Sequence, residues 1–271
     1  MAAINTYYDN FYLENIVNDF YNSKLDLQQF ATVDNNLQGT PGMSVKVHKY
    51  TATDGTQDVA IGEGNTESIV VSYAENPYYI KTAQSRFEYL DEEAMADPMV
   101  VPVGMQKAAA DMFNHVNADI TTELARATLN VTTATPDFAS FVDASALLNI
   151  ENLEGTYLYA LVSIADMAKV RKSLKDELKY VEAFAKQGYI GTVAGVNVFT
   201  KKDLTAGTIY VATKEAVTIF NKQGTEIEQI TKDKRGSADG NIRKNTIFTR
   251  KYYVTALTDA TKAAKITISN G

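Results

Sequence analysis

Two histidines and a run of three acids are the residues whose types could support catalysis or metal binding. His48 lies in a segment of alternating character and His115 in a long periodic one, and neither has a carboxylate at the spacing of a metal site. Asp91, Glu92 and Glu93 are adjacent, and adjacent residues on a helix do not share a face. We therefore predict solvated histidines, and an acidic start to a helix rather than a catalytic or metal-binding cluster.

Glycines in the segment GYIGTVAG resemble a phosphate-cradling turn. They are Gly188, Gly191 and Gly195, and they precede an expected strand instead of opening a helix, so a pyrophosphate would lack its helix N-terminus. The sequence carries no nucleophile elbow, phosphate loop, zinc motif or calcium loop, and zero cysteines exclude disulfides and thiolate sites. We predict no cofactor, no metal and no catalytic residues, with a soluble α+β enzyme as a remote alternative.

Charge is distributed unevenly along the chain. The formal net charge is −7, but residues 1–150 hold 7 Lys and Arg against 20 Asp and Glu, whereas residues 151–271 hold 19 against 13. Chance distribution over a solvated surface would explain this. The alternative is a pair of complementary surfaces that meet between copies of the chain, in a head-to-tail contact that closes rings or extends lattices.

The acidic side of such a contact is predicted in an extended ribbon and the basic side in the C-terminal part. The ribbon acids are Asp54, Asp58, Glu63 and Glu67, and the basic partner surface comprises Lys232, Lys234, Arg235, Arg243 and Lys244. Because basic groups bind phosphates by releasing counterions, weak contact with nucleic acid is a second interpretation of these cations together with Arg250 and Lys251.

One long helix is predicted over residues 102–129. Pro102 suits its first turn, and the helix is expected to stop near Asn130. Apolar residues recur at spacings of three and four and would line one face: Met105, Ala109, Met112, Val116, Ile120, Leu124 and Ala127.

Ahead of this helix, two segments favour contact with other surfaces. Residues 1–36 are rich in aromatic side chains that require burial, either in a docked N-terminal helix or in an arm on a neighbouring subunit: Tyr7, Tyr8, Phe11, Tyr12, Phe20, Tyr21 and Phe30. Residues 37–82 predict a long polar two-stranded ribbon that turns at Asp54-Gly55. Such a ribbon is marginally stable alone and must lie on something else.

Behind the helix, strands mix with helices without regular alternation, which predicts an α+β domain. We expect a short helix after Pro136, a strand in 155–163, and a helix in 164–180 with Met167, Val170, Leu174 and Leu178 on one face. Further strands are predicted in 207–220, 246–258 and 263–269, with 226–245 as a polar loop. No apolar run approaches the roughly 20 residues that span a membrane, and the N-terminus lacks a secretory signal, so we expect a protein located in a cytoplasm.

This succession of parts resembles the major capsid proteins of tailed bacteriophages, which have the Hong Kong 97-type fold. The resemblance rests on ALVSIADMAKVRKSL, GYIGTVAGVNVF and IRKNTIFTRKYYVTAL, and on the order of arm, hairpin, long helix and mixed domain. It implies an N-terminal arm over 1–36, an E-loop hairpin over 37–82, and a spine helix with part of a P-domain over 83–132. It further implies an A-domain over 133–240 and C-terminal strands returning to the P-domain over 241–271.

The family resemblance also implies a function. The expected role is a structural subunit that assembles into pentamers and hexamers of an icosahedral head, enclosing double-stranded DNA through weak, non-specific contact. Its localisation would be the virion, after assembly in the host cytoplasm. Portal and decoration proteins are implied partners, with a separate scaffolding protein or none, since no long helical extension precedes the arm; no membrane is implied. An encapsulin-like nanocompartment shell of the same fold remains the alternative.

Overall fold

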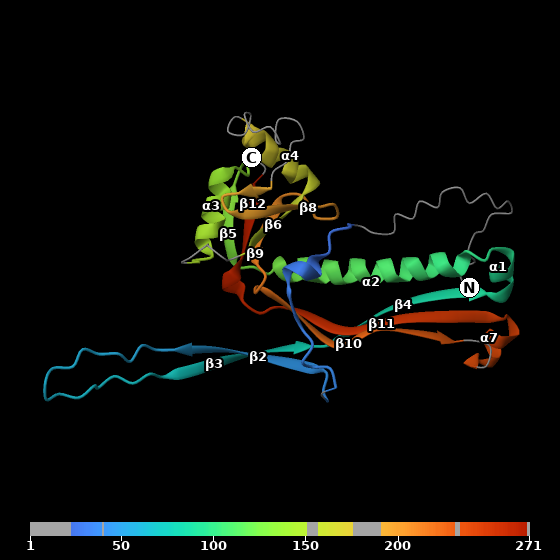
Figure 1. The fold of residues 1–271 in the computed structure, drawn as a ribbon, viewed down its shortest axis with the longest axis horizontal. Helices are drawn as coiled ribbons and strands as arrows, with labels where there is room; N and C mark the ends of the chain where they lie inside the picture. Colours follow the sequence, from blue (N-terminus) through green and yellow to red (C-terminus); the bar gives the residue numbers. More distant parts are fainter. Residues whose placement is uncertain (1–22, 40, 151–156, 176–190, 231–233, 270–271) are drawn as a thin grey trace.

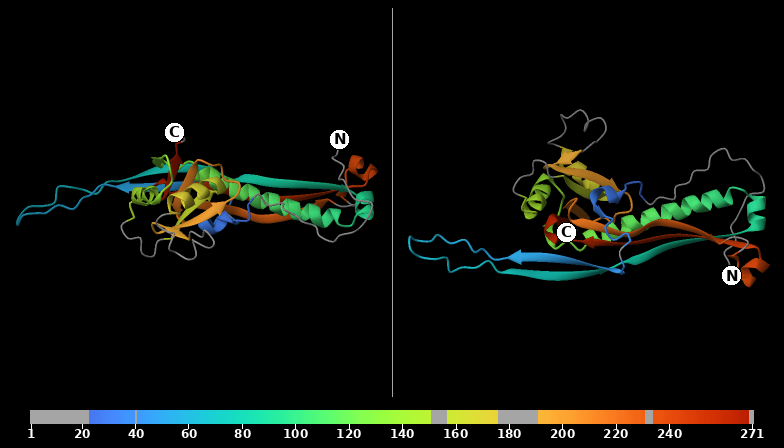
Figure 2. Two further views of the ribbon diagram at one scale, coloured as in Figure 1. Left: turned by 90° about the horizontal axis from the view of Figure 1, so that it is seen from above. Right: turned by 60° about the horizontal axis from the view of Figure 1, so that its bottom comes forward.

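The computed structural model describes residues 23–39, 41–150, 157–175, 191–230 and 234–269. It contains a four-stranded sheet, a six-stranded sheet and a separate two-stranded hairpin. Figure 1 shows the four-stranded sheet and a long helix extending to one side, the six-stranded sheet standing above them, and the hairpin projecting to the other side. In both views of Figure 2 the outer part of the hairpin projects away from the rest of the molecule.

The elongated part of the molecule is the four-stranded sheet, in the order β1-β10-β11-β4. Its longest strands, β10 and β11, are antiparallel neighbours, and β4 pairs antiparallel with β11 along one edge. The strands are β1 (Thr32–Asp34), β4 (Lys81–Leu90), β10 (Val217–Ile230) and β11 (Lys244–Leu257). Short helices lie near its far end: α1 (Asp91–Ala96) and α7 (Ser237–Asn241).

The predicted long helix is present as α2 (Val100–Leu124) and packs along one face of this sheet. Pro102 lies in its first turn, as expected, but the helix ends before residue 129 because Leu129 already begins a strand. Five of the seven predicted face residues are buried: Met112, Val116, Ile120, Leu124 and Ala127. Met105 and Ala109 are exposed, since the N-terminal half of α2 approaches the sheet through Gly104 and Ala108 instead.

The six-stranded sheet has the order β5-β12-β9-β6-β8-β7 and carries two helices on one face. The strands are β5 (Leu129–Thr133), β6 (Leu158–Ser163), β7 (Thr192–Val193), β8 (Val196–Lys201), β9 (Thr208–Thr213) and β12 (Ala263–Ile268). The helices are α3 (Phe138–Leu147) and α4 (Ile164–Ser173). Ser163 caps α4 by accepting a 3.0 Å hydrogen bond from the Asp166 backbone N–H, and Asp137 caps α3 in the same way.

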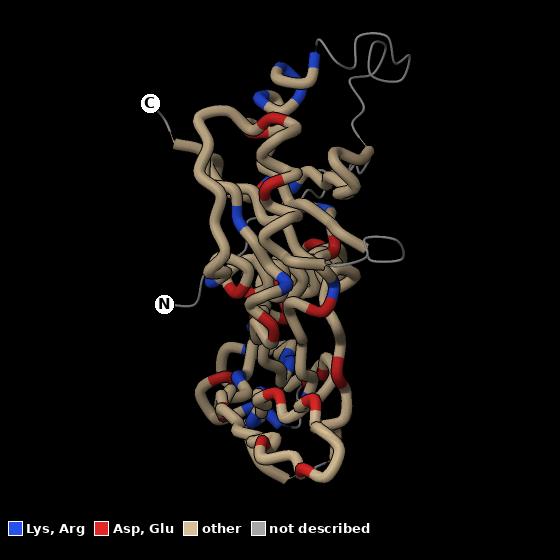
Figure 3. Tube along the Cα trace, turned by 90° about the vertical axis from the view of Figure 1, so that its left-hand side faces the viewer, with Lys and Arg blue, Asp and Glu red and all other residues tan. Residues whose placement is uncertain are grey.

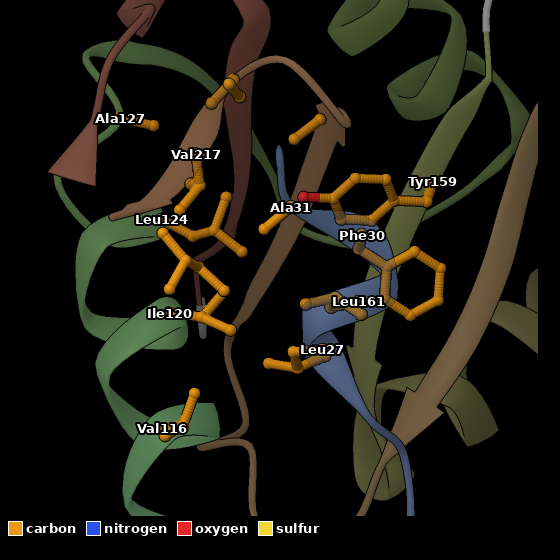
Figure 4. Packing of buried hydrophobic residues seen from close by; sticks show 14 of the residues in the cluster. Leu27, Phe30, Ala31, Val116, Ile120, Leu124, Ala127, Tyr159, Leu161 and Val217 are labelled. Carbon is orange, nitrogen blue, oxygen red and sulfur yellow. The ribbon is translucent and has the colours of Figure 1, made fainter. Parts of the chain in front are cut away.

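A core cluster joins the two sheets at the point where the N-terminal segment enters. The 3-10 turn η1 (Leu27–Phe30) inserts between Ile120 on α2 and Tyr159 on β6, as Figure 4 shows. The Phe30 ring lies 4.8 Å from the Tyr159 ring, measured between centroids. Asn117 on α2 accepts from the Leu27 backbone N–H at 3.1 Å, which fixes the turn on the helix. The segment ahead of the hairpin is thus part of the core.

Several expected boundaries differ from the observed ones. The strand β10 belongs to the elongated sheet, although 133–240 was expected to form one unit, and β12 returns to the six-stranded sheet beside β5. Residues 226–245, expected as a loop, hold the end of β10 and the helix α7. These differences arise because β10 pairs with β11 and β12 pairs with β5, and local polarity does not reveal either pairing. Within residues 1–36, the aromatic residues before Phe30 lie outside the described residues, as do Leu178, Gly188 and Lys232.

A close approach between α2 and β4 gives a first prediction. A Cβ added at Gly104 would overlap the ring of Phe87, which stacks on Tyr89 with centroids 5.8 Å apart. Glycine to alanine in a helix interior normally stabilises by roughly 0.5–1 kcal/mol. Here we expect Gly104→Ala to destabilise the fold by about 1–3 kcal/mol through overpacking, as measured by urea unfolding. Combining it with Phe87→Leu should restore part of the loss; a stabilised single variant would show that the ring moves freely.

Candidate functional site

The hairpin is the most exposed element of the described chain. Its strands β2 (Ser44–Ala52) and β3 (Val71–Tyr79) pair antiparallel, from Ser44 opposite Tyr79 to Ala52 opposite Val71. The two limbs continue alongside each other beyond the strands, where Thr53 N–H donates to the Val70 carbonyl at 3.0 Å. The predicted two-stranded hairpin is therefore confirmed. Its two limbs continue side by side beyond the ends of β2 and β3.

The turn lies further out than the sequence suggested. The predicted turn residue Gly55 sits within a limb, where a Cβ would come 2.7 Å from the backbone nitrogen of Ile69 on the other limb. The chain reverses instead near Gly62, which has a φ of 96°, beside a 3.0 Å hydrogen bond from Glu63 N–H to the Ala60 carbonyl. Gly55 is required by the close approach of the two limbs and not by a reversal.

Apolar side chains are exposed along the full length of the hairpin. The large ones are Met43, Tyr50, Val59, Ile61, Ile69, Val70, Val71, Tyr73 and Tyr79. Tyr50 and Tyr73 are paired across the strands, are each 64% exposed, and lie with the His48 ring in one aromatic group. An apolar set of this extent on a projecting element is typical of a protein contact surface. Sequence analysis, which described the ribbon as polar, missed this group.

The four predicted acids lie in the outer part of the hairpin. Asp54, Asp58, Glu63 and Glu67 are all exposed, and none forms an ion pair with another described residue. By contrast, Glu75 nearer the base pairs with Lys46, and this hydrogen-bonded pair lowers the pKa of Glu75 and raises that of Lys46. The outer hairpin thus presents uncompensated negative charge beside apolar side chains.

The base of the hairpin is fixed to the body by a small core. Val45, Val47 and Tyr78 pack against buried Phe220 and Val254 of the four-stranded sheet. The Tyr78 hydroxyl donates to the Leu257 carbonyl at 3.3 Å, and burial raises the pKa of this hydroxyl. The hairpin is therefore held at its base and projects from there.

The predicted basic surface is largely neutralised within the chain. Arg235 is only 9% exposed at its side chain and lies 2.9 Å from Asp91, while its guanidinium also donates to Asn245 at 2.5 Å. The hydrogen bonds from Arg235 and Asn245 hold the pKa of Asp91 below its usual range. Arg235 therefore closes the end of the elongated sheet, and its pairing within the chain does not support its predicted place on an open partner surface.

The remaining predicted cations divide in the same way. Lys244 is 14% exposed at its side chain and lies 2.8 Å from Asp239 and 3.3 Å from Glu88. Arg243 keeps an exposed side chain, 3.6 Å from an equally open Glu92, and Lys234 is exposed. Only Lys234 and Arg243 remain available, among the described members of this set, to an outside partner.

The candidate catalytic residues are placed apart. His48 is exposed on the hairpin and His115 on α2, where it lies 3.9 Å from Asp119. Asp119 already accepts from the Tyr253 hydroxyl at 2.5 Å and pairs with Lys81 at 2.7 Å. Burial and this carboxylate raise the pKa of the Tyr253 hydroxyl. Asp119 thus joins α2 to the sheet.

A groove beside His115 is lined by Ala83, Gln84, Ser85, Asp111, Met112, Asn114 and Ala118.

Over the described ranges, no three His, Asp or Glu residues gather into a metal-binding group. Asp91, Glu92 and Glu93 form the first turn of α1, as expected for an acidic helix start. Membrane-spanning length and apolarity are found in none of the described helices.

Comparison with known proteins identifies the architecture. No family model matches the chain. The major capsid protein of Staphylococcus phage phiMR11 is 26% identical over 254 residues, covering 92% of this chain and 89% of the relative. The capsid structure of cyanophage P-SCSP1u has a TM-score of 0.73 at 13% identity, covering 97% of this chain and 93% of that chain. The chain has the fold of phage major capsid proteins.

A further structure agrees with this assignment. A chain of Mycobacterium phage Che8 also has a TM-score of 0.73, at 13% identity, with 97% of this chain and 98% of that chain covered. The resemblance inferred from sequence and the Hong Kong 97-type α+β fold class are therefore confirmed. Because the similar proteins are structural components of phage capsids, a structural role in a phage shell is supported.

Proposed function

We propose that this protein is the major capsid subunit of a phage head, assembling into pentamers and hexamers of an icosahedral shell that encloses double-stranded DNA. The exposed hairpin carries this proposal. It holds exposed apolar side chains and four carboxylates that have no ion-pair partner among the described residues, and its described packing on the body lies at its base. In a monomer this apolar surface stays exposed to water, which is unfavourable. In a shell of many copies it is buried between subunits.

The proposed divisions follow the sheets rather than the predicted ranges. The hairpin within 37–82 corresponds to the E-loop and α2 to the spine helix. The four-stranded sheet with α1 and α7 corresponds to the P-domain, and the six-stranded sheet with α3 and α4 to the A-domain. Residues 1–36 are proposed as the N-terminal arm, whose described end is the η1 turn in the core.

The partners of this proposed subunit are chiefly other copies of itself. We place the outer hairpin on a neighbouring subunit, with Asp54, Asp58, Glu63 and Glu67 near exposed cations such as Lys234 and Arg243. The pairing of Arg235, Lys244 and Arg250 with acids of their own chain supports weak, non-specific contact with packaged DNA over a strong phosphate-binding surface. Scaffolding, portal and decoration proteins are further proposed partners. For the subunit itself we propose no catalytic activity, no cofactor and no membrane contact.

The location proposed for the mature protein is the virion, after assembly in the host cytoplasm. A nanocompartment shell of the same fold is the alternative, and it is not favoured, because the curated relative is a phage major capsid protein. The two differ in their contents, which are a genome in one case and cargo protein in the other.

Negative-stain microscopy and sedimentation of the purified full-length protein test this proposal. We expect rings, capsomers or closed shells that form as subunit concentration rises. Particles isolated from the natural source should release nuclease-protected DNA after disruption; particles filled with protein alone would support the nanocompartment. A monomer at every reachable concentration, with and without crowding agents, would contradict both shell functions.

A further inference from the structure

Helix α3 is apolar on the side that faces away from its own sheet. Its inner side packs Phe141, Ala144 and Leu148 into the core of the six-stranded sheet. Its outward residues are all exposed, and all but Asp143 are apolar: Phe138, Ala139, Val142, Asp143, Ala146 and Leu147. A helix that is apolar on every side is normally buried on every side. Among the described residues, this outward face of α3 is left exposed.

The position of α3 limits what could cover it. Helix α3 lies over β5 and β12, and α4 lies over β6 and β8 on the same face of the sheet. In the strand order these pairs belong to opposite ends of the sheet. The Ser173 hydroxyl donates to the Pro136 carbonyl at 2.8 Å, so the two helices form one continuous layer. Figure 1 shows α3 on the flank toward which the hairpin also projects.

Helix α4 presents the complementary chemistry. Its exposed residues are apolar near the start and basic near the end: Ile164, Ala165, Ala168, Arg171 and Lys172, followed by Lys175. Arg171, Lys172 and Lys175 have no ion-pair partner among the described residues, whereas the neighbouring Lys169 pairs with Asp166 at 3.1 Å. Figure 3 shows Lys and Arg gathered at the end of the molecule where α4 lies.

We infer that the outward face of α3 packs against the α4 end of the same domain in a second copy of this chain. In this contact the apolar outward face of α3 covers Ile164 and Ala168 of the second copy. Asp143 then lies near Arg171 and Lys172 of that copy. The two faces differ and lie toward opposite ends of one sheet, so the contact is heterologous, and its repetition closes a ring. This inference rests on the proposed shell function and names a surface for it separate from the hairpin.

The first test places a charge in the apolar strip. Val142→Glu should leave the circular dichroism spectrum unchanged and the monomer soluble. It should abolish the rings and shells seen by sedimentation and microscopy. Val142→Ala is the matched control, because it shortens the same side chain without charge and should assemble. Shells formed normally by Val142→Glu would overturn the inference.

A charge exchange provides a second test at exposed positions. Asp143→Lys alone, and Arg171→Glu with Lys172→Glu, should each raise the subunit concentration needed for assembly by about tenfold or more. The three substitutions together should recover most of the wild-type behaviour, which simple misfolding would not do. A combined variant no better than its parents would overturn the inference.

Wild-type protein assembled in parallel separates this inference from the shell function. If the wild type forms shells and the exchange variants give no rescue, only the α3 contact fails. If the wild type forms no assembly under any condition, the proposed shell function fails with it.

Discussion

A subunit in which Asn-Gly replaces residues 50–73 is expected to fold normally and to form no shells. Lys49 and Ala74 are directly opposed in the hairpin, so a two-residue turn can join them without altering the register below. The retained base keeps Val45, Val47 and Tyr78 in their core contacts. The excised limbs contribute exposed apolar area and no buried residue, so the free energy of unfolding should change by no more than about 1 kcal/mol.

Thermal unfolding and sedimentation measure the two halves of this expectation. The excised subunit should melt near the wild-type temperature and sediment as a monomer or small oligomer where the wild type forms particles. It still presents the surface that receives a neighbour's hairpin, so small amounts should enter wild-type particles when the two are mixed. Loss of the folded state would show that the excised limbs are needed for folding. Intact shells would show that they are not needed for assembly.

Reversing the four hairpin acids is expected to have the second largest effect. Asp54, Asp58, Glu63 and Glu67 have no ion-pair partner among the described residues of their own chain, so their change to lysine costs the monomer little. An exposed ion pair contributes about 0.2–1 kcal/mol, but reversal replaces attraction with repulsion at four positions in every copy. We expect assembly to be lost while the subunit stays folded and soluble.

The matched control replaces the same acids with Asn and Gln. This variant removes the attraction without adding repulsion, and should require about ten times more subunit for assembly, equivalent to roughly 1.4 kcal/mol. The wild type should also assemble less readily as salt rises, because exposed charges are screened. Normal shells from the lysine variant at low salt would show that the acids face solvent in the particle.

How far the sequence predicts this fold is clearest in α2. Its stripe of Met112, Val116, Ile120 and Leu124 is local information, because helix periodicity alone places these residues on one face. The exposure of Met105 and Ala109 is not local. It depends on the distance between α2 and β4, which is set by Gly104 meeting a phenylalanine 17 positions earlier in the chain.

Sheet membership was harder to predict than the strands themselves. The strand β10 was expected in part, but its polar end and the first two residues of its partner β11 lie inside the segment predicted as a loop. The polar end of β10 has many exposed residues, so it lacks the apolar pattern of a buried strand. Nothing in the local pattern of β12 selects β5 and β9 as its neighbours. Pairing between distant segments is decided by tertiary contacts.

The four predicted acids are exposed, as a contact surface requires, whereas part of the predicted basic set is paired within its own chain; the contact itself stays a prediction. Exposed Asp54 and Glu67 could be recognised because the ribbon around them has no core of its own. Arg235 could not, because Asp91, its partner, lies 144 positions away and reaches it only through the sheet. The outward face of α3 could have been found from sequence alone, since Phe138, Phe141 and Val142 spread apolar side chains over more than one side of the helix.

The joint between the two sheets has a mechanical consequence. The chain crosses it at 125–128, 214–216 and 258–262, and Phe30 fills the space between α2 and β6. Bending there would open a close-packed interior, so the body behaves as one stiff piece. In the proposed shell, we expect differences in curvature between sites to be taken up by bending of the hairpin, the described element whose contacts with the body lie at one end.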